Sequence, residues 1–453
     1  MGDNWTTESY KAFPAQQQVD YEDKELYASI LKKISKLPPL VCPSEIDNLS
    51  AQLKEAALGH KFILQGGDCA ETFDECQESF ILSKLKILLQ MSLVISYLGK
   101  KPVIKIGRIA GQYAKPRSKP TEMVNNKEVL TYRGDNINGI DPNNRNPDPN
   151  RLLLSHFYSS STLNYIRGVL NSGFADLHNP QQWDFSHVLN SDLKQEYTKI
   201  VDNMLDALGF LKLVGADNQT SANTFASKSP LSTVDFYTSH EGLHLNYEEQ
   251  LTSNCNGKFY DLSAHILWIG DRTRQLDHAH VEFFRGIHNP IGIKVGPTMS
   301  APDLIKLLNI LNPDKKIGKI ILISRFGKDL VEKHLPDMIH AVLNEKRKPC
   351  WIVDPCHGNT IQSSSGKKTR LYSSIVEEIS KTFKIHQECG SILNGIHLEL
   401  TGSSVTECVG GSMQLQHENL NENYQSNCDP RLNCEQSLDI AFMIATFLKK
   451  ANQ

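Results

Sequence analysis

The 453-residue sequence lacks several features that would point to a particular class of protein. None of its ten cysteines forms a C-x-x-C pair, so their spacing indicates neither a disulfide framework nor a zinc ribbon. The longest apolar stretch, Ile87–Leu98, contains polar residues and is too short to span a membrane. Walker A, G-x-G-x-x-G and G-x-S-x-G patterns are also absent.

No charge of one sign dominates the chain. Lys and Arg number 48 against 51 Asp and Glu, and the net charge of -3 provides no basic footprint for nucleic acid. Residues 1–13 lack the basic and apolar regions of a secretory signal. We therefore expect a cytoplasmic protein in a reducing compartment, without nucleic-acid or membrane partners.

What the sequence does contain is a series of short apolar segments, each ending in polar or glycine-rich residues. We predict eight strands: Lys61–Gln65, Pro102–Ile106, Val234–Thr238, His265–Ile269, Ile291–Val295, Lys319–Ile323, Trp351–Val353 and Gly395–Leu400. Helical patterns lie between most of them, including Ser79–Leu98, Ala301–Leu311, Gly327–Asn344 and Thr369–Phe383. Alternation repeated eight times favours a (β/α)8 barrel of the α/β class, although a doubly wound open sheet permits the same pattern.

Two regions exceed a minimal barrel. Residues 1–60 form an N-terminal extension with a helical pattern at Ser44–Leu58, and residues 61–453 form the barrel. An insertion at about residues 120–230 separates the second and third strands, with helical stretches around Ser160–Leu170 and Leu193–Leu213. It follows the carboxyl end of a strand, on the face where barrel enzymes build their sites.

The residues that follow the first, seventh and eighth strands suggest a metal site. These strands become neighbours when a barrel closes, and they offer Cys69, His357 and Glu399, with Asp429 in a later loop. Thiolate, imidazole and carboxylate together suit Mn, Fe, Co or Zn rather than Mg or Ca. The alternative is that Cys69 is a small buried hydrophobe and His357 a core histidine.

Four cations follow other strands, namely Arg108, Arg272, Lys294 and Arg325. Guanidinium groups bind phosphate and carboxylate oxygens bidentately, so these residues favour an anion site, against the alternative of simple ion pairing. A second basic cluster, Lys115–Ser118, either binds another phosphate or is a solvated loop. Two anion subsites beside a metal indicate an enzyme that joins or cleaves phosphorylated small molecules.

These residues lie in motifs that resemble the class II (plant-type) 3-deoxy-D-arabino-heptulosonate 7-phosphate (DAHP) synthases, in their bacterial form. The resemblance extends from about residue 20 to the C-terminus. Its motifs are Gln65–Glu71, Gly107–Thr121, Tyr132–Asp135, Trp268–Leu276, Asn289–Met299, Asp354–Thr360, His397–Gly411 and Cys428–Gln436.

The resemblance implies a metal-dependent transferase of the shikimate pathway. Such an enzyme condenses phosphoenolpyruvate with erythrose 4-phosphate and releases phosphate, on the route to chorismate and the aromatic amino acids. The implied metal, most often Mn²⁺, with Co²⁺, Zn²⁺ or Fe²⁺ as alternatives, would bind to Cys69, His357, Glu399 and Asp429. A homo-oligomer is also implied.

The resemblance also assigns the substrate residues. Phosphoenolpyruvate would be held by Arg108, Asp271, Arg272, Lys294 and Arg325, of which Arg272, Lys294 and Arg325 are the expected catalytic groups. Erythrose 4-phosphate would be held by Lys115, Arg117 and Ser118. Asp271 departs from the family pattern, which has glutamate there, and Cys356 stands in place of a methionine.

Two other interpretations remain open. The chain could be a catalytically silent regulatory homologue, or a related barrel synthase that uses another aldose phosphate. A cysteine, Cys428, precedes Asp429 directly, so we expect it near Cys69 and able to form a reversible disulfide with it in the metal-free enzyme.

Overall fold

The computed structural model describes residues 5–124, 126–172, 194–195, 198–203, 206 and 234–451. Within this part of the chain, eight parallel strands close into a barrel in the order β1-β14-β11-β10-β9-β8-β5-β2. They are β1 (Phe62–Gly67), β2 (Val103–Arg108), β5 (Tyr237–Glu241), β8 (Ile266–Ile269), β9 (Ile291–Val295), β10 (Ile320–Ser324), β11 (Cys350–Val353) and β14 (Gly395–Glu399). The predicted barrel is confirmed. The order begins with β1 and ends with β2, and these two strands also pair with each other. The sheet is therefore closed, which excludes an open sheet.

The third strand lies three residues later than predicted. The sequence placed it at Val234–Thr238, whereas β5 begins at Tyr237, which pairs with Ile106 of β2. Val234 and Phe236 instead pack against an apolar cluster that includes Ile81 and Ile166, outside the barrel. Their apolar character therefore reflects packing against helices rather than membership of the strand.

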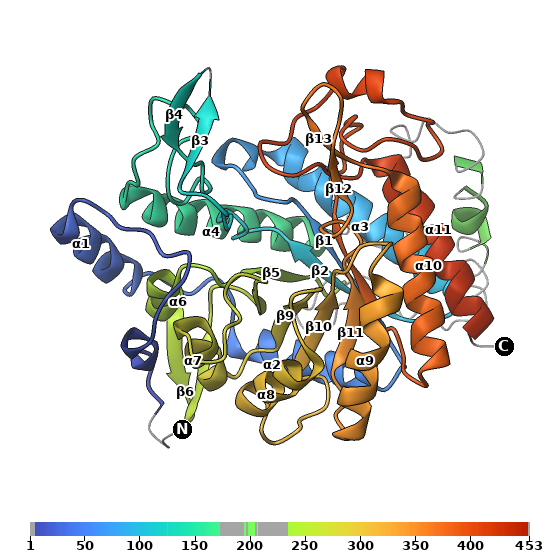
Figure 1. Ribbon diagram of the computed structural model, residues 1–453, viewed down its shortest axis with the longest axis horizontal. Coiled ribbons are helices and arrows are strands. Elements are labelled where there is room, and N and C mark those ends of the chain that lie inside the picture. Colours follow the sequence, from blue (N-terminus) through green and yellow to red (C-terminus); the bar gives the residue numbers. More distant parts are fainter. Residues whose placement is uncertain are drawn as a thin grey trace, which may run out of the picture.

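Helices surround the barrel (Figure 1), and their buried apolar side chains join those of the strands in one core. They are α3 (Glu78–Gly99), α7 (Ala279–Gly286), α8 (Ala301–Leu311), α9 (Val331–Asn344), α10 (Tyr372–Glu388) and α11 (Cys434–Ala451). The longest of these, α3, is apolar enough to cross a membrane by length and composition, but it packs against α11, β1 and β2, and 61% of its apolar window is buried. This burial accounts for its composition, since the core helix of a barrel is apolar on most sides.

The N-terminal extension covers two parts of the barrel. Helix α2 (Pro43–Ala57) buries Leu49 and Leu53 against the strands and lies below them in Figure 1. The earlier elements, η1 (Ser9–Ala12) and α1 (Lys24–Ile34), lie along one side beside α6 (Leu245–Leu251) and α7.

The insertion contains one long helix, α4 (Asn150–Asn171), which includes the predicted helical stretch around residues 160–170. Most of the second predicted stretch, at 193–213, lies outside the described residues. The sequence did not predict three two-stranded hairpins: β3 (Thr121–Val124) with β4 (Lys127–Leu130), β6 (Thr252–Cys255) with β7 (Lys258–Asp261), and β12 (Thr360–Gln362) with β13 (Lys368–Arg370). The β3–β4 and β12–β13 hairpins rise above the barrel, on the side opposite α2 (Figure 1).

Candidate active site

A cavity of about 480 Å³ opens at the carboxyl ends of the strands. Twelve residues were singled out from the sequence, and all but Glu399 line it. Those that line it are Cys69, Arg108, Lys115, Arg117, Ser118, Asp271, Arg272, Lys294, Arg325, His357 and Asp429. The fold brings them together because parallel barrel strands all end on the same face.

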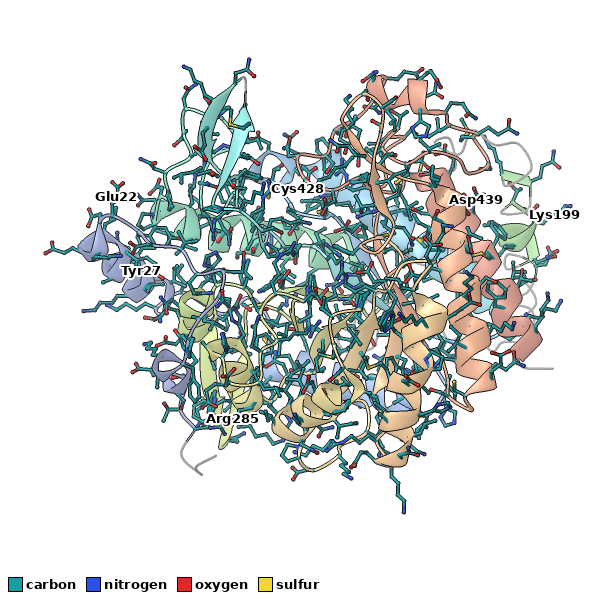
Figure 2. All side chains as sticks on the ribbon, in the orientation of Figure 1. Glu22, Tyr27, Lys199, Arg285, Cys428 and Asp439 are labelled. Carbon is teal, nitrogen blue, oxygen red and sulfur yellow. The ribbon has the colours of Figure 1, made fainter. Side chains whose placement is uncertain are left out.

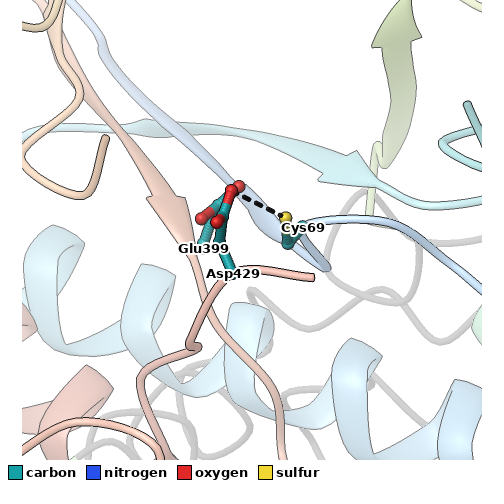
Figure 3. Close-up of side chains that lie close together, drawn as sticks. All are labelled: Cys69, Glu399 and Asp429. Atoms are coloured by element: carbon teal, nitrogen blue, oxygen red, sulfur yellow. Dashed lines mark hydrogen bonds between the residues drawn. The ribbon is translucent and has the colours of Figure 1, made fainter. Parts of the chain in front are cut away.

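Three of the predicted metal ligands form a compact group (Figure 3). One donor atom each from Cys69, Glu399 and Asp429 lies within 4.8 Å of the others, and the Cys69 thiol donates to Oδ2 of Asp429 at 3.6 Å. Strand pairing explains the meeting of two of them, since Gly67 of β1 is in register with Glu399 of β14 and Cys69 follows two residues later.

His357 stands at the edge of this group. Its Nε2 lies 3.0 Å from Oε1 of Glu399, and its Nδ1 lies 2.7 Å from Oδ2 of Asp354. The carboxylate of Asp354 orients the ring from the Nδ1 side, as carboxylates do for metal-binding histidines, and directs Nε2 toward Glu399 and the rest of the group.

In this structure a cation of the protein itself, the Lys115 ammonium, lies within the group. The Lys115 ammonium donates to Cys69 Sγ at 2.6 Å and to Asp429 Oδ2 at 2.7 Å, and lies 4.0 Å from Glu399 Oε1. Sequence reasoning placed Lys115 in the aldose phosphate subsite, whereas here its ammonium lies among the expected metal ligands. The groups that hold this positive charge are a thiol and two carboxylates, with an imidazole at their edge, and these are types of donor that suit a divalent metal.

Burial and neighbouring charges set the protonation of the group in opposite ways. Burial raises the pKa of the Cys69 thiol well above its ordinary value, so the thiolate needs a nearby cation. Burial would also raise the pKa of Glu399, but the charges of His357, Arg370 and Lys115 hold it well below the usual range. Glu399 is therefore ionised and available as a ligand.

The four cations singled out from the sequence lie around the same cavity, and three of them have carboxylate partners. Arg108 lies 3.2 Å from Glu399, Lys294 lies 2.5 Å from Asp354, and Arg325 lies 3.4 Å from Asp271. Among the described residues, Arg272 has no carboxylate within 4 Å. Its Nη2 donates to Ser118 Oγ at 2.9 Å, and it retains its charge for an anion.

A buried histidine, His397, joins two of these cations. Its Nε2 lies 2.6 Å from Arg108 Nη1 and 3.0 Å from Lys294 Nζ, and its Nδ1 donates to Gln65 Oε1 at 2.9 Å. Burial, together with the charges of Lys294 and Arg108, holds the pKa of His397 well below its usual value. The neutral ring therefore accepts from both cations and fixes their spacing.

Burial also lowers the pKa of Lys294, with smaller contributions from Arg108 and Arg325, against the opposing charge of Asp354. A lysine in this environment gives up its proton more readily than an exposed one. The indole of Trp268 lies under the same cations, with its ring centre 5.8 Å from Lys294 Nζ and 5.3 Å from Arg108 Cζ.

Trp268 and Glu241 are among the lining residues that had no role assigned from the sequence. Trp268 belongs to β8, and its apolar character indicated only core packing. Glu241 is the last residue of β5, and among the described residues its buried Oε1 has no hydrogen-bond partner. Burial raises the pKa of Glu241, and the charges of Lys115, Lys294 and Arg272 oppose that effect. Its place at a strand end was a signal that could have identified it.

The fold and the site define a barrel protein with a cation-lined cavity and a candidate metal centre at the carboxyl ends of its strands. The chain belongs to the class-II DAHP synthetase family, whose model matches residues 5–445. A phospho-2-dehydro-3-deoxyheptonate aldolase of Neurospora crassa is 48% identical to it over 97% of this chain and 94% of that protein.

Bacterial proteins of the same name are also similar. The one from Streptomyces coelicolor is 42% identical over 96% of each chain. The one from Mycolicibacterium smegmatis is 39% identical over 98% of this chain and 94% of that protein. Fungal and bacterial relatives both match over nearly their full lengths. Similarity to the family therefore does not separate the expected bacterial form from a fungal one.

Proposed function

We propose that this protein is a DAHP synthase, which condenses phosphoenolpyruvate, erythrose 4-phosphate and water to DAHP and phosphate. The observation that carries the proposal is that Cys69 and Asp429, grouped with Glu399, line the same cavity as Arg108, Arg272, Lys294 and Arg325. Family membership supplies the identity of the two substrates.

A divalent metal, Mn²⁺ by resemblance, would be held by Cys69, His357, Glu399 and Asp429 and would supply Lewis-acid polarisation of the aldehyde. Co²⁺, Zn²⁺ and Fe²⁺ suit the same donors. Lys115 would move from its present place among these donors toward the aldose phosphate, together with Arg117 and Ser118.

The chain's own residues then position the reactants. Arg272, Lys294 and Arg325, with Arg108 and Asp271, hold phosphoenolpyruvate so that its C3 faces the aldehyde carbon of the sugar. Attack by C3 forms the new carbon–carbon bond, water adds at C2, and the resulting phosphohemiketal loses phosphate. Lys294, held between Asp354 and His397, is the residue that we assign to deliver a proton to the developing alkoxide.

The test is phosphate release from phosphoenolpyruvate plus erythrose 4-phosphate, before and after chelation, with Mn²⁺, Co²⁺ and Zn²⁺ added back separately. Activity that disappears with the chelator and returns with metal is the expected result. Release with a different aldose phosphate alone would identify a related synthase. If folded protein releases no phosphate with any aldose phosphate, the chain is a catalytically silent homologue.

We also propose that the enzyme is a cytoplasmic homo-oligomer. This expectation comes from the family resemblance. Light scattering on the purified full-length chain measures its mass directly, and a single 50.9 kDa species would contradict it.

A further inference from the structure

The N-terminal extension crosses the rim of the catalytic face. The backbone N–H of Ala279, at the start of α7, donates to the carbonyl of Pro14 at 2.9 Å. The side-chain amide of Gln18 donates to the carbonyl of Leu243 at 2.8 Å. Leu243 follows β5 and Ala279 follows β8, so residues 14–18 pass over the carboxyl ends of these two strands.

Between these anchors, Gln17 reaches the loop Lys115–Ser118. Its side-chain Oε1 accepts the backbone N–H of Arg117 at 2.9 Å, and its carbonyl accepts Nη1 of Arg133 at 3.4 Å. Gln17 has a φ of 63°, in the left-handed region that non-glycine residues seldom adopt. Such a conformation persists only where the surrounding contacts hold it.

The loop's other contacts come from the barrel and its insertion. The N–H of Lys115 donates to the carbonyl of Arg133 at 2.8 Å, and Ser118 accepts from Arg272. The chain approaches closely here because residue 134 is glycine: a Cβ at Gly134 would lie 1.9 Å from the carbonyl oxygen of Tyr113. Gln17 is therefore the contact through which the extension holds the backbone between Lys115 and Ser118.

We propose that Gln17 is a positioning residue for the sugar-phosphate subsite. By accepting the Arg117 N–H, it orients the backbone from which Arg117 and Ser118 reach toward the phosphate. The inference rests on the proposed function, which assigns those two residues to the aldose phosphate. Gln17, a residue outside the barrel, would then set the affinity for erythrose 4-phosphate and leave the affinity for phosphoenolpyruvate unaffected.

The test compares two substitutions at the same position. Gln17→Asn tolerates the left-handed backbone, but its amide is one methylene shorter and withdraws the acceptor from Arg117. We expect its KM for erythrose 4-phosphate to rise about five- to tenfold, the effect of one lost hydrogen bond, with KM for phosphoenolpyruvate unchanged. Gln17→Glu keeps the acceptor oxygen and should therefore keep amide exchange at Arg117 at the wild-type rate. Gln16→Ala, in the same segment and exposed, is the matched control.

Hydrogen–deuterium exchange of the full chain provides a readout that does not depend on turnover. Gln17→Asn should speed exchange in the peptide containing Arg117, whereas Gln16→Ala should not. Unchanged exchange, or equal rises in both KM values, would overturn the proposal. An inactive wild-type enzyme with faster exchange in Gln17→Asn would overturn the proposed function alone and leave the anchoring of the loop supported.

Discussion

The ammonium of Lys115 lies 2.6 Å from the thiol sulfur of Cys69, closer than it lies to any carboxylate oxygen that it contacts. Burial lowers the pKa of Lys115, but Cys69, Asp429 and Glu399 together raise it well above its ordinary value. The residue therefore remains charged and neutralises the donors that we assign to a metal.

Replacing this lysine should destabilise the metal-free protein. In Lys115→Met the buried Glu399 and the half-buried Asp429 lose a counter-charge, and we expect a loss of about 3 kcal/mol in the free energy of unfolding. Added Mn²⁺ should raise the Tm of the variant more than that of the wild type, since the metal replaces the missing charge. Thermal unfolding with and without metal measures both effects.

The exposed Lys119 lies in the same loop, and Lys119→Met is the matched control. If metal raised the Tm of wild type and Lys115→Met equally, the ammonium would not be substituting for the metal.

Arg325→Ala should lose both substrate affinity and turnover. The guanidinium lines the cavity, and its removal takes a charge from the proposed phosphoenolpyruvate subsite, so we expect a decrease of about 100-fold in kcat/KM. Steady-state kinetics measure it. Arg274→Ala is a suitable comparison because Arg274 pairs with the same carboxylate, Asp271, at 2.7 Å but does not line the cavity. Equal effects of the two substitutions would indicate that Arg325 acts only by holding Asp271.

Glu241→Gln should lower kcat with little change in either KM. The buried Oε1 of Glu241 has no hydrogen-bond partner among the described residues and faces the cavity, so we propose that it accepts a proton from the water that adds at C2. The variant keeps the shape of the side chain but removes that capacity. A decrease of about 100-fold is typical of a lost general base. Initial rates at saturating concentrations of both substrates provide the measurement. A wild-type kcat would assign Glu241 to packing against Gly270, which lies directly beside its carboxylate.

The thiols of Cys69 and Cys428 influence each other, since Cys69 makes the largest contribution to lowering the pKa of Cys428, and neither cysteine is in a disulfide. Cys428 lies on the catalytic side of the barrel, between the two raised hairpins (Figure 2). In metal-free protein treated with hydrogen peroxide, we expect a disulfide between them, with the peroxide reduced to water. Peptide mapping detects the bond.

Bound metal should protect the thiols, because Cys69 is then a ligand, and a reductant should restore activity to the oxidised enzyme. Finding both thiols unmodified after oxidation of the metal-free protein would rule out the pair as a redox site.

Much of the architecture could be predicted from the sequence because the signals are local. Buried parallel strands are short and apolar, and β9 and β10 occur within one residue of the predicted positions. The site residues could be singled out for a related reason, since a side chain just after a barrel strand faces the catalytic side whatever the details of packing. The assignments of metal and substrate residues remain predictions until the variants are measured.

The sequence by itself determined the barrel, the family and the set of polar residues at the strand ends. Only the tertiary structure decided which of them meet. Lys115 lies among the metal-ligand candidates because their negative charge is buried and needs a cation, and Gln17 reaches Arg117 because the extension is anchored on both sides of it. These contacts join residues 46 and 100 positions apart, and no local pattern encodes a pairing over such distances.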